Sequence, residues 1–394
     1  MGPVMLIHLL LTATLVQQQK ISLTKPDAEY SEPFTQVRSV RELANGKVLV
    51  SDIQDKIVQL VDFAAGSSVK IGREGQGPEE YLFPMGLYPM PDGSTVLQDM
   101  GNRRFLPILA DGRIGKAFSP PAPPARTAQE ERRGQFAIVG AALMNVRGAD
   151  AKGKLYFQGM ALPADGTNAG ADSVPIMTWD RVSPRIDTIA WLPIPADQRP
   201  QVQRDGGRTT FMVRLGSGGA WPKQTSWLPA PDGRIAIVSP EPYQVTWINE
   251  KRRTAGPVIP VSLPKVTEAD RKEWLDRQAK AKPMGMIFVG PGGGNAPPSK
   301  MPLPNASEVT WPETLPVFTG NDAVQMTPEG QVWVQRVKPV IERTPSYDVF
   351  DGTGKLVGSV TLRPKSRVAG FGKGTVYVVR TDDDDLQYLE RYRR

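Results

Sequence analysis

Carboxylate and amide side chains recur at two equivalent places in this sequence. Asp52 and Asp99 each end a short β-branched run, and Asn102 follows in the turn after the second run. Oxygen donors of this kind suit Ca²⁺, so the pattern is compatible with a calcium site. The alternative is that each aspartate accepts backbone N–H groups in an Asx-turn, which needs no metal. We favour the turn, because a single metal site would not need copies of one motif.

Arginines form the second candidate set. Arg208, Arg214, Arg252 and Arg253 lie in or near long stretches between the strands that the sequence predicts. A guanidinium group binds carboxylate, sulfate or phosphate through paired hydrogen bonds, and insertions on one face of a repeat fold commonly build its binding surface. We therefore predict that these four arginines contribute to binding. The alternative is that they are ordinary solubilising residues.

Histidine and cysteine chemistry is almost absent. The single histidine is His8, within the apolar first 19 residues, and there is no cysteine. Once that segment is removed, the chain has no thiolate nucleophile, no disulfide and no imidazole to ligate zinc, iron or copper. Arrangements of the Ser-His-Asp kind are excluded for the same reason. Any catalysis would have to work without histidine or cysteine chemistry.

A glycine-rich segment from Gly72 to Gly77 raises the question of a phosphate site. A P-loop needs Gly-Lys-Ser/Thr at the start of a helix, whereas here the chain continues as Pro78-Glu79-Glu80-Tyr81. We interpret the segment as a shaped connection between two sheets.

Six small turns, each followed by a β-branched or aromatic run, must position these side chains. The turn glycines are Gly46, Gly93, Gly153, Gly233, Gly330 and Gly374. Glycine supplies the positive φ of a tight hairpin, and the run after it suits a half-buried strand. Antiparallel units repeated at this scale predict an all-β fold, a six-bladed β-propeller.

The spacing between turns locates the insertions. Gly46 to Gly93 is 47 residues and Gly330 to Gly374 is 44, which suits one four-stranded blade each. The other steps are longer, and the excess falls in residues 120–133, 164–172, 195–219 and 264–311. The last stretch contains a capping-box-like start at Thr267 before a run of helical composition. We expect a short helical insertion between blades four and five.

The N-terminal residues suggest export. Residues 1–19 carry no charge and centre on an apolar run shorter than the about 20 residues of a membrane span, as in a secretory signal. A retained anchor or a misplaced start codon is the alternative, and membrane contact is expected only through this segment. Residues 20–394 are expected to form one domain. We predict that Lys20 to Thr24 pairs with the Leu386–Tyr392 stretch, completing the sixth blade and closing the ring.

Several segments resemble a known family. They are Gly72 to Tyr81, Pro91 to Gly93, Asp99 to Arg104, Tyr347 to Gly352 and Gly374 to Val379. In these the chain resembles exported bacterial six-bladed β-propeller proteins related to NHL-repeat proteins. The resemblance implies a fold and a location in the periplasm, on the cell surface or outside the cell, rather than a reaction.

Charge and composition limit the classes of partner that the protein is expected to bind. The 48 Lys and Arg against 41 Asp and Glu give a net charge of +7, which favours anionic partners. The basic residues are scattered, so nucleic acid is not expected. We predict a non-catalytic binding propeller without a cofactor, whose partner is a protein or an anionic small molecule or glycan. The alternative is a Ca²⁺-dependent lactonase- or esterase-like hydrolase with carboxylates in the central channel; a channel lined by Pro, Met, Val and Arg would count against it.

Overall fold

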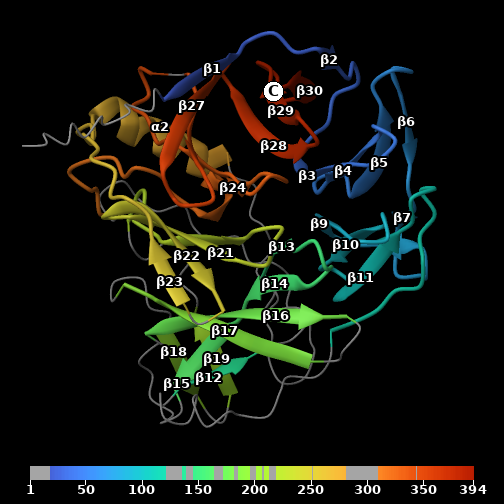
Figure 1. Ribbon diagram of the computed structural model, residues 1–394, viewed down its shortest axis with the longest axis horizontal. Helices are drawn as coiled ribbons and strands as arrows, with labels where there is room; N and C mark the ends of the chain where they lie inside the picture. Colours follow the sequence, from blue (N-terminus) through green and yellow to red (C-terminus); the bar gives the residue numbers. More distant parts are fainter. Residues whose placement is uncertain are drawn as a thin grey trace, which may run out of the picture.

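Six antiparallel sheets surround a common axis in the computed structural model of the chain (Figure 1). The structure describes residues 18–120, 135–138, 145–163, 172–181, 185–195, 201–205, 208–212, 219–250, 252–280, 309–342 and 344–394. The predicted six-bladed β-propeller is confirmed. Most of the predicted signal segment, residues 1–17, lies outside the described residues.

Each blade is built from consecutive strands that run outward from the axis. From the innermost strand outward they are β3 (Val37–Glu42), β4 (Val48–Asp52), β5 (Ile57–Asp62) and β6 (Ser67–Lys70) in blade one; β9 (Pro84–Pro89), β10 (Thr95–Asp99) and β11 (Arg104–Ile108) in blade two; β13 (Asn145–Ala149), β14 (Leu155–Gln158), β16 (Ser173–Asp180) and β17 (Arg185–Pro193) in blade three; β20 (Ser226–Pro229), β21 (Ile235–Pro240), β22 (Tyr243–Asn249) and β23 (Arg252–Ala255) in blade four; β24 (Val324–Met326), β25 (Val332–Gln335), β26 (Ser346–Phe350) and β27 (Leu356–Leu362) in blade five; and β28 (Ser366–Gly372), β29 (Thr375–Thr381) and β30 (Gln387–Arg393) in blade six. Three short pairs lie outside the blades: β7 (Arg73–Glu74) with β8 (Glu80–Tyr81), β12 (Gln135–Ile138) with β15 (Met160–Pro163), and β18 (Gln201–Asp205) with β19 (Arg208–Met212).

The six predicted turns all connect an innermost strand to the second strand of its blade. Their glycines have φ between 69° and 87°, a conformation that side chains with a Cβ rarely adopt. The strand after each turn is buried on both sides, because it lies between two neighbouring sheets. In β4 and β10 every residue is buried. The turn and the apolar run after it therefore encode the repeat.

The hydrophobic core is divided among the spaces between adjacent blades. Leu49 of blade one packs with Leu97 and Leu106 of blade two in one such cluster. Val48 and Val50, on the other face of β4, pack against Val379 of blade six. Each blade thus buries both faces only when its two neighbours are present, so the ring has to close.

Closure uses a different N-terminal segment from the one that the sequence predicts. The predicted segment forms β1 (Gln19–Leu23), which runs parallel to β27, with Ile21 opposite Val360 and Leu23 opposite Leu362. It is a fifth strand of blade five, so its assignment to blade six is wrong. Leu23 is buried in the apolar cluster that also contains Val360 and Leu362 of β27. Burial of these apolar side chains accounts for the pairing.

The strand that completes blade six is β2 (Ala28–Glu29), which lies antiparallel beside β30. Ion pairs hold it there: Asp27 with Arg391 at 2.7 Å, and Glu29 with Arg380 at 2.9 Å. These partners are more than 350 residues apart in the sequence. A two-residue strand fixed by charges has no hydrophobic alternation, which is why the sequence pattern did not reveal it.

Two further expectations concern single blades. The predicted outer strand of blade two, Arg113 to Phe118, makes only isolated bridges at Ile114 and Phe118. Pro107 of β11 has no N–H to return the bond that its carbonyl accepts from Gly115, at 2.8 Å, so the ladder is interrupted. The predicted helical insertion is confirmed as α2 (Glu268–Lys280). Thr267 caps it: its Oγ1 accepts from the Asp270 N–H at 3.2 Å.

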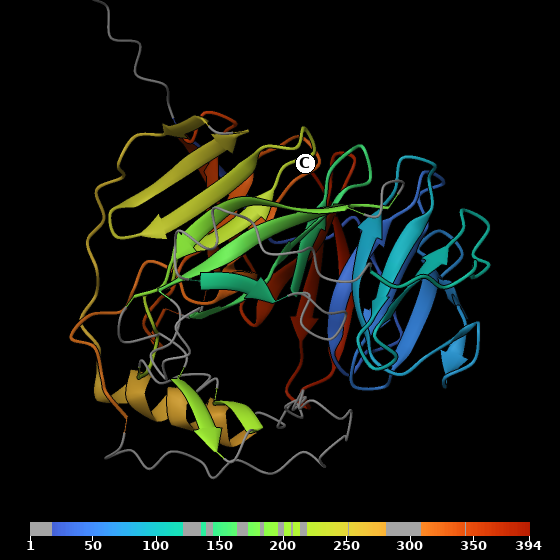
Figure 2. The same cartoon turned by 90° about the horizontal axis from the view of Figure 1, so that it is seen from below.

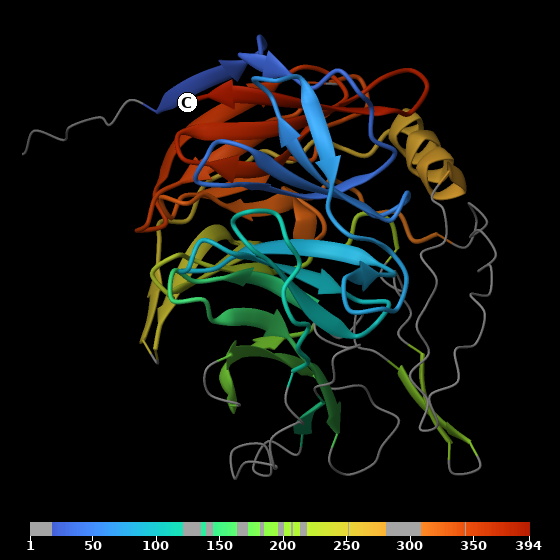
Figure 3. The same cartoon turned by 90° about the vertical axis from the view of Figure 1, so that its right-hand side faces the viewer.

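One face of the ring carries the long connections. Every innermost strand starts at this face, which we call the insertion face. The turns between second and third strands lie there too, and so do the connections from each outer strand to the next blade. The four predicted insertions all fall in such connections. Figures 2 and 3 show α2 and the β18–β19 hairpin on the same side of the ring. Within the described residues, no helix is long and apolar enough to cross a membrane.

Candidate functional site

Three arginines project from innermost strands of different blades. Arg38 lies on β3 of blade one, Arg147 on β13 of blade three and Arg367 on β28 of blade six. The innermost strands contact one another in the order β28, β3, β9, β13, β20, β24. A bond of 2.9 Å from Gln325 Nε2 of β24 to the carbonyl of Val368 on β28 completes the circle. The three arginines therefore approach the axis from three directions.

Two of these arginines lie at β-bulges, Arg38 eight residues before the turn glycine of blade one and Arg147 six residues before that of blade three. Val37 and Ser39 are separated by Arg38, yet they pair with adjacent residues of β4. Val146 and Gly148 flank Arg147 in the same way opposite β14. A bulge leaves one residue unpaired and redirects its side chain. The local structure thus turns an arginine out of each ladder.

Arg38 reaches across the axis to blade five. Its guanidinium donates to Asp322 Oδ2 at 2.8 Å. Asp322 belongs to the single-turn helix η3 (Asn321–Ala323), which leads into β24. This ion pair joins residues 284 positions apart.

Arg147 and Arg367 are held more tightly by the protein. Arg147 donates to the carbonyl of Asn321 at 2.9 Å and to Ser226 Oγ at 3.3 Å. Arg367 donates to the carbonyl of Val37 and to Gln387 Oε1, the latter at 3.5 Å. Their charges are therefore fixed in position by neutral acceptors, without a carboxylate in direct contact.

Among the described residues, Asp322 is the carboxylate whose charge favours the protonated form of all three arginines. Surrounding protein disfavours its charge, but Arg38 first, and then Arg147 and Arg367, outweigh this and lower the pKa of its carboxyl. The side chain nevertheless keeps 75% of its exposure to solvent. Asp322 is therefore a solvent-exposed carboxylate whose charge is stabilised by arginines from three blades.

The arginines remain charged at neutral pH. Burial lowers the pKa of Arg147 to about 10, with a further contribution from the neighbouring Arg38. Burial also lowers the pKa of Arg367. For Arg38 the effect of burial is overcome by Asp322, and its pKa is raised. Three positive charges and one negative charge leave two positive charges in this axial cluster.

Tyr88 completes the cluster as a neutral group. Burial raises its pKa well above the ordinary value. Its hydroxyl donates to the carbonyl of Val146 at 3.0 Å, next to the bulged Arg147. The axial cluster therefore offers fixed positive charge and hydrogen-bond donors, which suits an anion rather than a cation.

The arginines predicted from the sequence lie elsewhere. Arg252 and Arg253 are exposed on β23, the outermost strand of blade four. Arg208 begins β19 in the hairpin on the insertion face, and Arg214 lies outside the described residues. The structure does not bring Arg252 and Arg253 to the axis. A binding role for these four arginines stays a prediction.

The alternative metal ligands are not brought together either. Asp52 accepts hydrogen bonds from the backbone N–H groups of Thr35, Gln36, Gln54 and Asp55, at 2.7 to 3.0 Å. Asp99 occupies the same place in blade two. Its carboxylate accepts from the N–H groups of Leu82 and Phe83, both at 3.1 Å, and from Asn102 Nδ2 at 2.7 Å. Each aspartate ties the start of an innermost strand to the second strand. In the part of the chain that the structure covers, no three acidic, histidine or cysteine side chains gather as metal ligands.

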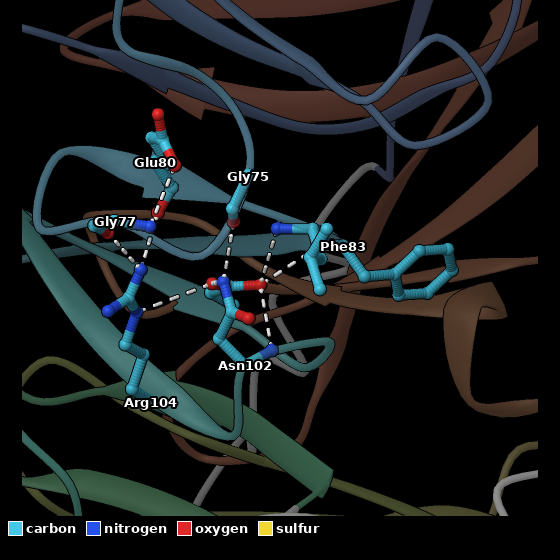
Figure 4. Close-up of polar contacts among 8 residues, drawn as sticks. Gly75, Gly77, Glu80, Phe83, Asn102 and Arg104 are labelled. Carbon is cyan, nitrogen blue, oxygen red and sulfur yellow. Dashed lines mark hydrogen bonds and ion pairs between the residues drawn. The ribbon is translucent and has the colours of Figure 1, made fainter. Parts of the chain in front are cut away.

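The glycine-rich segment is held by the same part of blade two (Figure 4). Asn102 Nδ2 donates to the carbonyl of Gly75 at 2.9 Å, and Arg104 donates to that of Gly77 at 2.6 Å. The N–H of Gly77 donates to Glu80 Oε2 at 2.7 Å, so this donor is not free for a phosphate. The interpretation as a shaped connection between blades one and two agrees with these contacts.

The axial arginines were missed because their signal is weak. Each is a single arginine next to a valine in a short stretch that alternates poorly, as in Val37-Arg38-Ser39 and Val146-Arg147-Gly148. Such a residue looks like an ordinary surface position of a strand. Alignment of the innermost strands on their turn glycines would not have singled them out, because Arg38, Arg147 and Arg367 lie eight, six and seven residues before those glycines.

Comparisons with known proteins show only the fold. No family model matches the chain, and no curated protein matches it. Among solved structures, the chain is similar to a member of the DUF4221 family from Bacteroides vulgatus (10% identity, 93% and 94% of the two chains covered, TM-score 0.46) and to a putative exported protein from Bacteroides fragilis (10%, 95% and 100%, 0.45). It is also similar to a gluconolactonase from Xanthomonas campestris (11%, 93% and 92%, 0.40). At these scores the similarity carries no information on activity, and a relation to NHL-repeat proteins is not shown.

Proposed function

We propose that this protein is an exported, non-catalytic binding propeller whose ligand carries a negative charge. The ligand binds over the axis, where Arg38, Arg147 and Arg367 meet. The observation that carries the proposal is that three blades each contribute a guanidinium group to a cluster with one carboxylate. Several fixed positive charges near one point attract an oppositely charged group more strongly than a single charge does.

Export is supported by the apolar, uncharged character of residues 1–19. The non-catalytic part is supported by the sequence, which has no histidine after residue 8 and no cysteine. The alternative of a Ca²⁺-dependent hydrolase ranks second, because two net positive charges in the axial cluster oppose a divalent cation there.

Binding of a panel of anions to the protein without residues 1–17 tests the proposal. The panel contains sulfate, phosphate, glucuronate and an acidic oligosaccharide, with glucose as the neutral comparison and Ca²⁺ as the test of the alternative. We expect Arg38→Gln to weaken anion binding at least tenfold, since guanidinium–oxyanion bonds are among the stronger hydrogen bonds.

The matched control is Arg113→Gln, which removes an arginine that is 78% exposed and pairs only with Asp111. It changes the net charge equally and should leave binding unchanged. Arg252→Gln tests the outer strand of blade four in the same assay. Loss of binding in Arg252→Gln but not in Arg38→Gln would move the site away from the axis. Hydrolysis of a lactone that depends on Ca²⁺ would establish the alternative.

A further inference from the structure

Asp322 occupies the place where an anionic ligand would bind. Its carboxylate accepts from Arg38 at 2.8 Å and is the most exposed charge of the axial cluster, at 75% of its side chain against 35% for Arg38. Arg38 has five N–H donors in a planar fork, and Asp322 is its described acceptor. The carboxylate therefore stands between Arg38 and the solvent.

Little else holds the Asp322 side chain in place. Its one described hydrogen bond is the one from Arg38. The backbone of η3 is held separately, because Arg147 binds the carbonyl of Asn321 and Ser226 Oγ donates to Asn321 Oδ1 at 3.2 Å. Rotation of the Asp322 side chain can free Arg38 while the backbone stays bound.

We propose that Asp322 is an internal occupant of the anion site, and that a ligand binds by replacing its carboxylate on Arg38 with its own carboxylate, sulfate or phosphate group. This inference rests on the proposed function. The exchange breaks one ion pair and forms another on the same guanidinium, so Arg38 remains satisfied in both states. Arg147 and Arg367 stay in place and supply the charge that retains the ligand.

The exchange also explains why a carboxylate in an anion site is useful. An exposed ion pair is weak, so a ligand that offers a second anchoring contact can replace Asp322. A lone ion in solution gains little from the exchange. The site is thereby selective for an oxyanion that is part of a larger molecule, such as an acidic sugar.

The test compares Asp322→Asn with the unchanged protein and with Asp111→Asn. Asparagine keeps the shape of the side chain but gives up the charge that competes for Arg38. Asp111 is likewise an exposed partner of one arginine, so its variant makes the same change in net charge away from the axis. The probes are sodium sulfate, inorganic phosphate and glucuronate, and the readout is Kd from calorimetry.

We expect Asp322→Asn to tighten the Kd of the anions about tenfold, which corresponds to about 1.4 kcal/mol, and Asp111→Asn to leave it unchanged. The gain should be largest for inorganic sulfate and phosphate, which have no second anchor, and it should disappear in the double variant Arg38→Gln with Asp322→Asn. The inference is wrong if Asp322→Asn changes the Kd of glucuronate as little as Asp111→Asn does while Arg38→Gln still abolishes binding. Asp322 would then be a direct ligand contact or a bystander. If Arg38→Gln has no effect on any probe, the proposed function is wrong as well.

Discussion

Asp99 offers the sharpest test of how this propeller is held together, because the same residue is a candidate metal ligand. Its side chain is fully buried. It accepts from the N–H groups of Leu82, Phe83 and Asn102, at 3.1, 3.1 and 3.3 Å, and lies 3.6 Å from the Nε atom of Arg104. We consider the substitution Asp99→Ala.

The magnitude follows from the contacts that are lost. Three backbone donors lose their acceptor, at about 1 kcal/mol each, the lower end of the range because Leu82 and Phe83 are only partly buried. Asn102 Nδ2 also loses its bond to Asp99 but keeps its bond to the Gly75 carbonyl, so it adds little. Arg104, whose side chain is 17% exposed, loses its carboxylate partner, for about 1 kcal/mol more. We expect Asp99→Ala to lower the free energy of unfolding by about 4 kcal/mol. Asp99→Asn retains an acceptor oxygen and should cost about 1.5 kcal/mol.

The assay is urea unfolding of the two variants and the unchanged protein, each in Ca²⁺ and in chelator. Asp111→Ala serves as the control, because Asp111 is exposed and accepts from the Arg113 N–H in an ordinary turn. Asp111→Ala should lower the free energy of unfolding by less than about 1 kcal/mol. If Asp99 only accepts turn hydrogen bonds, Asp99→Ala lowers the free energy of unfolding by the same amount in Ca²⁺ and in chelator. If Asp99→Ala is as stable as the unchanged protein in chelator and differs only when Ca²⁺ is added, the reasoning is refuted and Asp99 is a metal ligand.

Two further predictions concern buried ionisable groups. Glu390 is fully buried and accepts from Arg363, from Arg380 Nε at 2.8 Å and from the Tyr392 hydroxyl at 2.7 Å. Glu390→Gln should lower the free energy of unfolding by about 3 kcal/mol. The control is Glu329→Gln, whose carboxylate pairs with Arg394 and is itself exposed, and it should cost less than about 1 kcal/mol. Equal losses of the two variants in urea unfolding would contradict this prediction. Burial raises the pKa of Tyr347 to about 12, against its hydrogen bond from Val368 and the charge of Arg367. The folded state then holds a proton that the unfolded state loses near pH 10, so Tyr347 alone should make the free energy of unfolding fall by at most about 1.4 kcal/mol per pH unit from pH 10 to about 12. Other buried tyrosines with raised pKa values add to this fall. Tyr347→Phe should make the slope less steep by up to that amount in unfolding curves measured along the alkaline range, and an unchanged slope would show that Tyr347 does not titrate there.

The two N-terminal strands, β1 and β2, show which features the local sequence indicates and which depend on residues far along the chain. Ile21 and Leu23 correctly indicate a strand, because their alternation suits one buried face. Which blade receives that strand depends on which edge offers matching apolar side chains, and β27 does so. The last blade is instead completed by Ala28 and Glu29, which are fixed by ion pairs to residues near the other end of the chain.

The sequence by itself determined the repeat, because hairpin glycines and the apolar runs after them are local signals set by φ and burial. It also determined that the chain has no thiol and that its one imidazole is His8, within the predicted signal segment. Only the tertiary structure decided what lies at the axis. A β-bulge shifts the direction of Arg38 and Arg147 without leaving a compositional trace, and closure of six blades then brings these arginines, Arg367 and Asp322 into one cluster. Charges far apart in the chain interact only once the ring has set the distances between them.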